Sequence, residues 1–296
     1  MTSAVAGADR AERPVPAMPS TSAREEPLAE AEIPLVFRIG AVLALVVMLL
    51  PVVIVVLAGL NAGEYLTFPP RGLSLRWVIS FLTSPSLRTS YLLSLTIASV
   101  VMLFSTTLGT MAALFLTRVE FPGRSLMRAY FLAPLMLPGL VVGLALYVFY
   151  IVTNVGLART LPGMIIGHVV VTVPYVIGTV SAALYNFDVS LEDAARSLGA
   201  GPVRAFRAIT LPVISPGIMA GSIFAFIVSF GQFDVSLFLS TPNVTPLPIA
   251  MYNSLRYRFE PTAAAAGVFA IVLVVLSMLL TNRLTNLARF AGIKFS

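Results

Sequence analysis

Long apolar runs separated by short polar segments dominate the chain. A helix needs roughly 20 apolar residues to cross the hydrocarbon core of a bilayer, which is about 30 Å thick. Six runs of about this length can be traced along the sequence. They cover residues 37–60, 91–116, 129–152, 164–185, 214–239 and 263–280. This pattern predicts an all-α membrane protein with six transmembrane helices.

The segments outside the runs suggest how the chain is divided. Residues 35–285 form the predicted six-helix transmembrane domain, and residues 186–212 are a polar, arginine-bearing loop within it. Residues 1–34 are rich in Ala, Pro, Ser and Glu, a composition that predicts a disordered tail. No short apolar region with a small-residue cleavage site precedes the first run, so we expect that run to be an uncleaved anchor. Residues 286–296 form the second predicted tail.

The basic residues predict the orientation of the chain. With six spans, both termini lie on the same side of the membrane. Thirteen of the 19 basic residues lie in the chain up to Arg38, in the chain from Arg283 onward and in the loops after the second and fourth runs. The positive-inside rule therefore places both termini and the loop 186–212 in the cytoplasm. The net charge of +6 then belongs to loop ends near lipid headgroups, and we expect no nucleic-acid partner.

Composition narrows the possible chemistry. Hydrophobic residues make up 58% of the chain and charged residues 11%, values that exclude a soluble globular domain. With no cysteine and His168 as the sole histidine, neither a thiol nucleophile nor a histidine-pair metal site can form. An intramembrane hydrolase is therefore poorly supported. Lys294 is the only lysine and precedes Phe295, so the chain has no phosphate-binding loop for ATP. We expect no cofactor on this chain, and any ATP-driven motor must be another polypeptide.

The loop 186–212 contains a motif of fixed spacing within the segment EDAARSLGAGPVRAFRAITLP. From Asp193 the motif reads acid-Ala-Ala, three residues, Gly, nine residues, Ile, one residue, Leu-Pro. Its residues are Glu192, Asp193, Ala194, Ala195, Gly199, Ile209, Leu211 and Pro212. The motif resembles the EAA loop of bacterial ABC importer permeases, through which the membrane subunit contacts its cytoplasmic ATPase. One departure is that the glutamate of the family falls on Asp193, with Glu192 beside it.

The residues of this loop predict two short helices joined at a glycine. Ser190 with Asp193 three residues later is typical of a capping box at a helix start. Gly199 suits the left-handed conformation that ends a helix, and Pro202 suits the first position of the next. One narrow apolar face is expected from Leu191, Ala194, Ala195 and Leu198. Such a compact unit can fit a socket on a partner, and a solvated loop without a partner is the alternative.

The resemblance implies a fold and a set of partners. The fold is the six-helix, type I (MetI-like) permease fold in the bacterial inner membrane. The partners are a second permease chain, usually a related one, a cytoplasmic ATPase dimer that binds ATP-Mg, and an extracytoplasmic substrate-binding protein. The segments LTFPPRGLSLRW and TPNVTPLPIAMYNSLRYRFEP are similar to those of the spermidine/putrescine-type branch. This similarity favours a polyamine or another small organic amine, while phosphonate, iron and oxyanions remain open.

Asp234 is the one acidic residue within an apolar run. An ionised carboxylate in the bilayer costs at least about 2.5–3.5 kcal/mol, so it usually faces a cavity or a partner. Asp234 either lines the substrate pathway and attracts an amine, or forms an ion pair with another span or subunit. Phe230 and Phe233 are expected near its helix face. His168 and Tyr175 complete the candidate pathway, although an interhelical hydrogen bond is the favoured role of His168.

Breaks in three of the runs suggest where the molecule moves. Pro134 and Pro138 lie one turn apart, and Gly139 and Gly143 permit a close helix neighbour. The fourth and fifth runs also contain prolines, so motion is expected in these three spans, with ordinary kinked packing as the alternative. An ion-coupled secondary transporter is less favoured, because such proteins often show repeated halves and several intramembrane acids.

Two external segments are expected to form surface helices that receive the binding protein. The segment 77–81 contains the only tryptophan, Trp77, which we expect at the level of the lipid headgroups. The segment 252–259 is the second predicted surface helix.

Overall fold

The computed structural model describes residues 34–65, 67–257 and 261–290, and all its named elements are helices. Five helices are long and apolar enough to cross a membrane, or up to six spans if a bent helix pair counts as one. The predicted all-α membrane fold is thus confirmed. The predicted tail 1–34 lies outside the described residues except for Pro34, and the last helix continues to Phe290, past the predicted start of the second tail at 286.

The long helices are α1 (Leu35–Gly59), α3 (Pro85–Arg118), α6 (Leu161–Tyr185), α9 (Leu211–Phe230) and α12 (Thr262–Phe290). The shorter helices are α2 (Arg76–Thr83), α4 (Arg124–Met136), α5 (Gly139–Val152), α7 (Ser190–Ser197), α8 (Pro202–Ala205), η1 (Phe206–Thr210), α10 (Asp234–Leu239) and α11 (Leu247–Tyr257). The chain divides into two compact units, 1–49 and 50–296. In the first unit, the described part of α1 is an apolar helix with exposed side chains.

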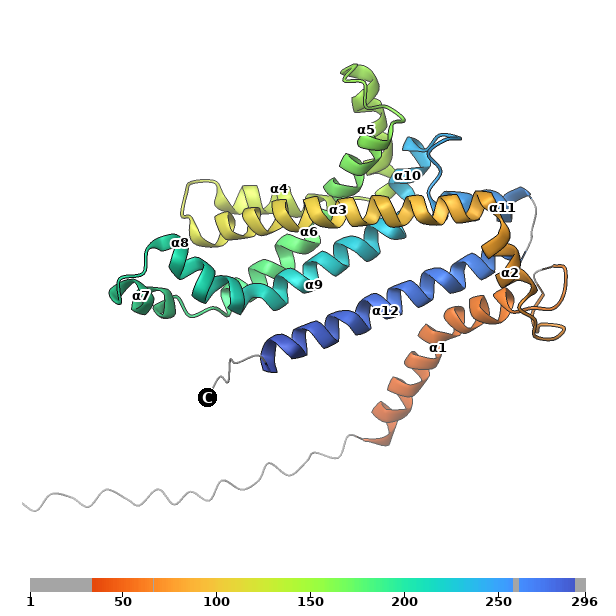
Figure 1. The fold of residues 1–296 in the computed structure, drawn as a ribbon, viewed down its shortest axis with the longest axis horizontal. Helices are drawn as coiled ribbons and strands as arrows, with labels where there is room; N and C mark the ends of the chain where they lie inside the picture. The colour runs from red at the N-terminus through yellow and green to blue at the C-terminus, as the bar shows by residue number, and fades with distance from the viewer. Residues whose placement is uncertain (1–33, 66, 258–260, 291–296) are drawn as a thin grey trace, which may run out of the picture. The chain divides into compact units, whose positions relative to one another are not determined.

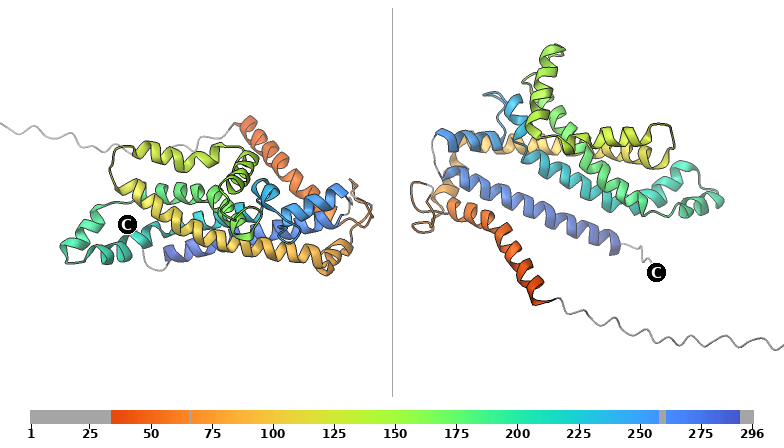
Figure 2. Two further views of the ribbon diagram at one scale, coloured as in Figure 1. Left: turned by 90° about the horizontal axis from the view of Figure 1, so that it is seen from above. Right: turned by 180° about the vertical axis from the view of Figure 1, so that it is seen from behind.

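Helices α3, α6 and α9 pack on one another and form the centre of the second unit (Figures 1 and 2). Glycines allow their backbones to approach closely. A Cβ atom added to Gly109 of α3 would lie 2.6 Å from Cβ of Val176, and one added to Gly221 of α9 would lie 3.0 Å from Cα of the same valine. Val176 of α6 therefore fits between two glycines, one from each neighbouring helix.

The third and fifth predicted spans, in which prolines suggested breaks, are each divided into two helices. The run 129–152 is split into α4 and α5, which meet at 107°. Pro138 precedes α5 and cannot donate the backbone hydrogen bond that a continuous helix would need. The run 214–239 breaks after Phe230, and its last part is the separate helix α10, which packs on α5. Neither run is therefore one continuous helix, and the break in the third span lies at Pro138, one of the two prolines that suggested it.

The end of the second unit formed by α2, α11 and the start of α12 contains the segments predicted as surface helices (Figure 1). Trp77 of α2 is buried and its Nε1 donates a hydrogen bond to the carbonyl of Gly63 at 3.0 Å. Trp77 therefore belongs to the core with Phe81 and does not lie on an exposed face of α2. Helix α11 begins at Leu247, five residues before the predicted segment 252–259.

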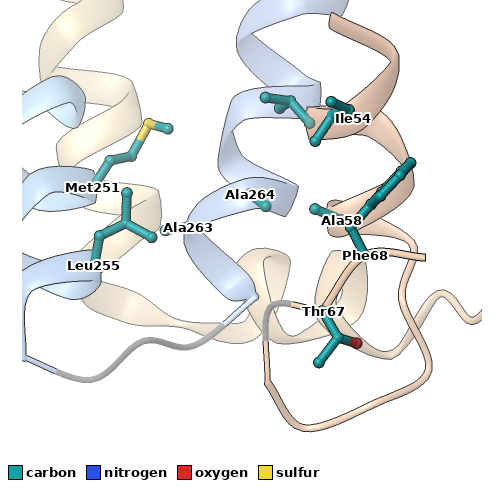
Figure 3. Close-up of a pocket in the computed structure, with 9 residues that line it drawn as sticks. Ile54, Ala58, Thr67, Phe68, Met251, Leu255, Ala263 and Ala264 are labelled. Atoms are coloured by element: carbon teal, nitrogen blue, oxygen red, sulfur yellow. The ribbon is translucent and has the colours of Figure 1, made fainter. Parts of the chain in front are cut away.

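An apolar cavity of about 350 Å³ opens between the end of α1, α11 and the start of α12 (Figure 3). It is lined by Ile54, Val55, Ala58, Thr67, Phe68, Met251, Leu255, Ala263 and Ala264. The cavity lies at the opposite end of the central helices from α7 and α8 (Figure 1).

Candidate functional site

The motif loop begins with helix α7, whose first turn is held by Asp188. Its Oδ1 accepts a hydrogen bond from the backbone N–H of Ser190 at 2.9 Å. Hydrogen bonds from Ser190 hold the pKa of Asp188 below its ordinary value. The predicted capping box from Ser190 to Asp193 is wrong, since α7 has no side-chain cap of that kind. Glu192 and Asp193 do lie in the first turn, where the helix dipole favours acids.

Gly199 ends α7 in the left-handed conformation, as its sequence position predicted, with φ of 86°. The chain restarts as a helix at Pro202, which is also as predicted. The second helix of the loop is not separate, however, because α8 continues through the π-helical turn η1 into α9. Residues Pro202–Phe230 form one apolar helix of 29 residues. A displacement of this part of the loop therefore acts directly on the fifth span.

Residues 190–205, which we call the coupling knob, present apolar side chains to the outside. Leu198 is 89% exposed and Val203 67% exposed. Leu191, Asp193 and Ala194 are exposed on α7. Exposed apolar groups that gather on one loop mark an interaction surface. The knob therefore has the surface character of a docking element.

Glu192 points the other way, into the protein, and forms a clamp with two residues of other helices. It is 5% exposed. Nη1 of Arg118, the last residue of α3, donates to its carboxylate oxygens Oε1 and Oε2 at 2.9 and 2.8 Å. The Thr210 hydroxyl of η1 also donates to Oε1, and Nη2 of Arg118 lies 3.4 Å from that hydroxyl. The Glu192 clamp thus joins α7 to the end of α3 and the start of the fifth span.

The clamp keeps Glu192 ionised. Burial alone would raise the pKa of Glu192, but hydrogen bonds from Thr210 and Arg118, with the positive charges of Arg118 and Arg196, outweigh it. The pKa of Glu192 is consequently lower than its ordinary value. Arg118 also lies over the ring of Phe187, at 5.5 Å from its centroid.

The other motif residues extend from the knob to the start of α9. Ala195 is half-buried and Ile209 of η1 likewise, whereas Leu211 and Pro212 are exposed. Sequence reasoning grouped Glu192 with the ATPase contacts and missed Arg118 and Thr210. The sequence contained a signal for the Glu192 clamp, because Arg118 follows the second apolar run and a buried acid needs a basic partner.

Asp234 lies where two broken spans meet. It is the first residue of α10, and its side chain packs on Gly139, the first residue of α5. A Cβ atom added to Gly139 would lie 2.9 Å from Cβ of Asp234. A carboxylate is favoured beside the positive end of a helix, which helps to explain how the charge is tolerated. In the described part of the chain Asp234 forms no ion pair, so of the two alternatives the pair with another span is not found there.

The structure separates the other candidate pathway residues. Phe233 lies beside Asp234 at the break, with its ring centroid 5.3 Å from that of Tyr252. Phe230 is 3% exposed and packs in the aromatic core, 5.6 Å from the ring of Tyr91. Tyr175 stacks on Phe224 at 6.5 Å. The prediction that Phe230 and Phe233 share one helix face with Asp234 is wrong, because the helix ends at Phe230.

His168 bridges the same break from α6. It is 1% exposed. Its Nδ1 lies 3.0 Å from the Ser229 hydroxyl of α9, and its Nε2 lies 3.0 Å from the Ser236 hydroxyl of α10. The favoured interhelical hydrogen bond is thus confirmed. His168 holds the two sides of the break together next to Asp234.

Comparison with known proteins matches this arrangement to one family. Residues 105–289 match the family model described as binding-protein-dependent transport system inner membrane component. The chain belongs to this family. It is 35% identical to the molybdenum transport system permease protein ModB of Escherichia coli K12 over 223 residues, which cover 70% of this chain and 97% of ModB. It is 32% identical to the putrescine transport system permease protein PotI of the same strain over 216 residues, covering 71% and 76% of the two chains.

Solved structures agree with the fold of this permease. A chain of the MetNI methionine ABC transporter superposes with a TM-score of 0.57 at 19% identity, over 68% of this chain and 95% of that one. A chain of a bacterial alginate ABC transporter, in complex with a periplasmic protein, gives 0.63 at 17% identity, over 84% and 93%. By its family, the protein is a multi-pass inner-membrane permease subunit of an ABC importer, and its relatives are transport permeases.

Proposed function

We propose that this permease forms half of a translocation pathway and couples it to a separate cytoplasmic ATPase dimer through the coupling knob. The observation that carries the proposal is the two-sided geometry of α7. One side exposes Leu198 and Leu191, while the other is bonded through Glu192 to the ends of two spans. ATP-Mg binds to the ATPase, and both termini of this chain lie in the cytoplasm with the knob.

The clamp indicates how motion passes from the knob to the membrane. Arg118 is the last residue of α3, and Thr210 precedes α9 directly. A force on α7 therefore reaches both spans through the same carboxylate. Because α8 and α9 are one continuous helix, approach of two ATPase subunits would tilt the fifth span together with α3. A second, homologous permease chain supplies the other half of the pathway, and an extracytoplasmic binding protein delivers the substrate.

The substrate that the site favours is a polyamine or another small organic amine. Asp234 is the single carboxylate among the described residues of the spans, and it lies at a break that is bordered by Phe233 and Tyr252. Carboxylates within a bundle mark ion and substrate pathways, and aromatic faces attract cations. The resemblance to PotI and to the spermidine/putrescine transport system permease protein PotC, 27% identical over 81% of this chain, supports the same choice.

A tetrahedral oxyanion such as molybdate is the second candidate. It is supported by the 35% identity to ModB. The N-terminal ends of α5 and α10 meet at the break, and the longer of these, α5, supplies the kind of positive end that favours anions.

Uptake into vesicles distinguishes the two substrates. The vesicles contain this permease with its ATPase, its second permease chain and its binding protein. We expect labelled putrescine to enter and the Asp234→Asn variant to lower its uptake at least tenfold, with basal ATP hydrolysis unchanged. Glu120→Gln, which neutralises an exposed carboxylate, is the matched control and should transport normally. Undiminished putrescine uptake in Asp234→Asn would remove the role of the carboxylate, and uptake of molybdate instead of putrescine would establish the second candidate.

A further inference from the structure

A large polar cavity lies at the end of the second unit away from the coupling knob. Its volume is about 920 Å³, and it is bordered by the starts of α3 and α12, by α2 and α11, and by the segment 242–245. Its polar lining consists of hydroxyl and amide side chains, among them Ser86, Ser90, Asn243 and Asn253. Among the described residues that line it there is neither a carboxylate nor a cationic side chain. The cavity is therefore rich in hydrogen-bond donors, and the lining residues that the structure describes bring no negative charge to it.

The N-terminus of α3 contributes a positive electrostatic potential to this cavity. Ser84, Pro85, Ser86 and Leu87 all line it, and they are the N-cap and first turn of a helix of 34 residues. The Ser84 side chain makes no capping hydrogen bond, and the first turn contains no acid. The first N–H groups of a helix have no partner within the helix, and together with the helix dipole they favour a bound anion.

Ser90 supplies an independent sign of a ligand. It lies one turn further along α3, is only 5% exposed, and lines the cavity. Within the described part of the chain its hydroxyl has no hydrogen-bond partner. Ser94, one turn beyond, has one, since its Oγ accepts the backbone N–H of Leu247 at 2.8 Å. Buried hydroxyls are normally satisfied by protein, water or ligand, and Ser90 borders the cavity, from which a water or a ligand can reach it.

We propose that this cavity binds a tetrahedral oxyanion group at the start of α3, with the Ser90 and Ser86 hydroxyls as donors. An ammonium group would meet the positive end of α3 and find no carboxylate among the described lining residues, so it fits less well. The volume leaves room around the oxyanion for water or for the remainder of a headgroup. The group comes either from a free oxyanion in solution or from the phosphate of a phospholipid. The site is independent of the substrate proposed above.

Two variants test the site in the full chain, purified and placed in nanodiscs. Ser90→Ala removes the buried donor. Ser86→Asp places a carboxylate on the exposed first turn of α3, where it satisfies the helix dipole and competes with an incoming anion. Thr96→Ala is the control for the first change, because its exposed hydroxyl already bonds to the carbonyl of Leu92. Asn154→Asp adds the same charge at an exposed position away from the cavity lining.

Binding is measured in two arms. Calorimetric titration with molybdate reports a free oxyanion, and native mass spectrometry with phosphatidylglycerol reports a retained lipid. We expect Ser90→Ala and Ser86→Asp to weaken binding at least tenfold in one of the arms, while both controls behave as the wild type. Loss in the molybdate arm assigns the site to a free oxyanion, and loss in the lipid arm assigns it to a headgroup. Binding that is absent, or equal in all five proteins, in both arms overturns the proposal. Ser86→Asp carries the test alone if Ser90→Ala does not fold.

Discussion

Replacing Glu192 by glutamine removes the charge of the clamp while nearly preserving its shape. Breaking a fully buried ion pair costs about 3–5 kcal/mol. The side chain of Arg118 is 32% exposed, however, so water can reach its guanidinium once the partner is neutral. We therefore expect Glu192→Gln to cost less than that, about 1.5–3 kcal/mol, which is the contribution of a hydrogen bond to a charged group. Since 1.4 kcal/mol is a factor of ten, opening of α7 from its two spans should become roughly 10- to 100-fold more frequent.

Hydrogen exchange of α7 in the assembled transporter measures this opening directly. The amides of α7 should lose protection by the stated factor in Glu192→Gln, and substrate-stimulated ATP hydrolysis should fall with it, because a loosely held knob transmits less force. Asp193→Asn is the matched control. It removes the same charge from the next residue, but the Asp193 side chain is exposed, so protection of α7 should not change.

A double-mutant cycle decides whether the clamp is the cause. Arg118→Met combined with Glu192→Gln leaves no unpaired charge, so the two effects should not add. We expect an interaction energy of at least about 1 kcal/mol between the two sites, within the range for contacting residues. Effects that add within 0.5 kcal/mol, or an unchanged exchange rate in Glu192→Gln, would refute the reasoning.

Because the pKa of Glu192 lies below its ordinary 4.5, the stability that the clamp contributes is fully present above about pH 4.5 and is lost as the pH falls through the lowered value. The difference in α7 protection between wild type and Glu192→Gln should therefore be constant near neutrality and shrink in acid. A difference that grows in acid would contradict the assignment. Gly199→Val forces a β-branched residue into the left-handed region at a cost of at least about 1–2 kcal/mol. It should therefore abolish substrate-stimulated ATP hydrolysis without preventing insertion into the membrane. The control Gly201→Ala, at a residue with φ of −67°, should leave the stimulated ATP hydrolysis unchanged. Gly139→Ala places a Cβ atom 2.9 Å from Cβ of Asp234, and this overpacking should lower thermal stability by about 1–3 kcal/mol and reduce uptake. The control Gly178→Ala, whose added Cβ has no atom within 4 Å, should change neither. Equal melting temperatures of the two variants would show that the contact at Gly139 is not tight.

The helices were predictable where a local rule decides them. Apolar length marks a span whatever surrounds it, and so α3 and α6 were located within a few residues at most ends. Gly199 was also predictable, since the left-handed end of a helix depends on the residue itself. The bend between α4 and α5 was not. Pro138 indicates a break, but the angle of 107° depends on the helices that pack on α4 and α5. That packing cannot be read from the sequence.

The candidate site divides in the same way. The motif around Asp193 indicated the coupling knob because its spacing is local. The inward orientation of Glu192 depends on Arg118, 74 residues earlier, and no periodicity links the two. Asp234 was identified as unusual by its charge alone, yet its surroundings were inferred from a continuous helix that in fact ends at Phe230. Its real neighbour, Gly139, comes from another span.

The contact between the coupling knob and the ATPase is the central claim, and one cross-linking measurement tests it most directly. The chain has no cysteine, so Leu198→Cys introduces a single reactive thiol at a side chain that is 89% exposed. A cysteine-directed photo-crosslinker on this residue, in membranes that contain the whole transporter, should yield one adduct with the ATPase. Val155→Cys, also exposed but on the loop after α5, should yield none. An ATPase adduct from Val155→Cys as readily as from Leu198→Cys, or none from Leu198→Cys, would contradict the account.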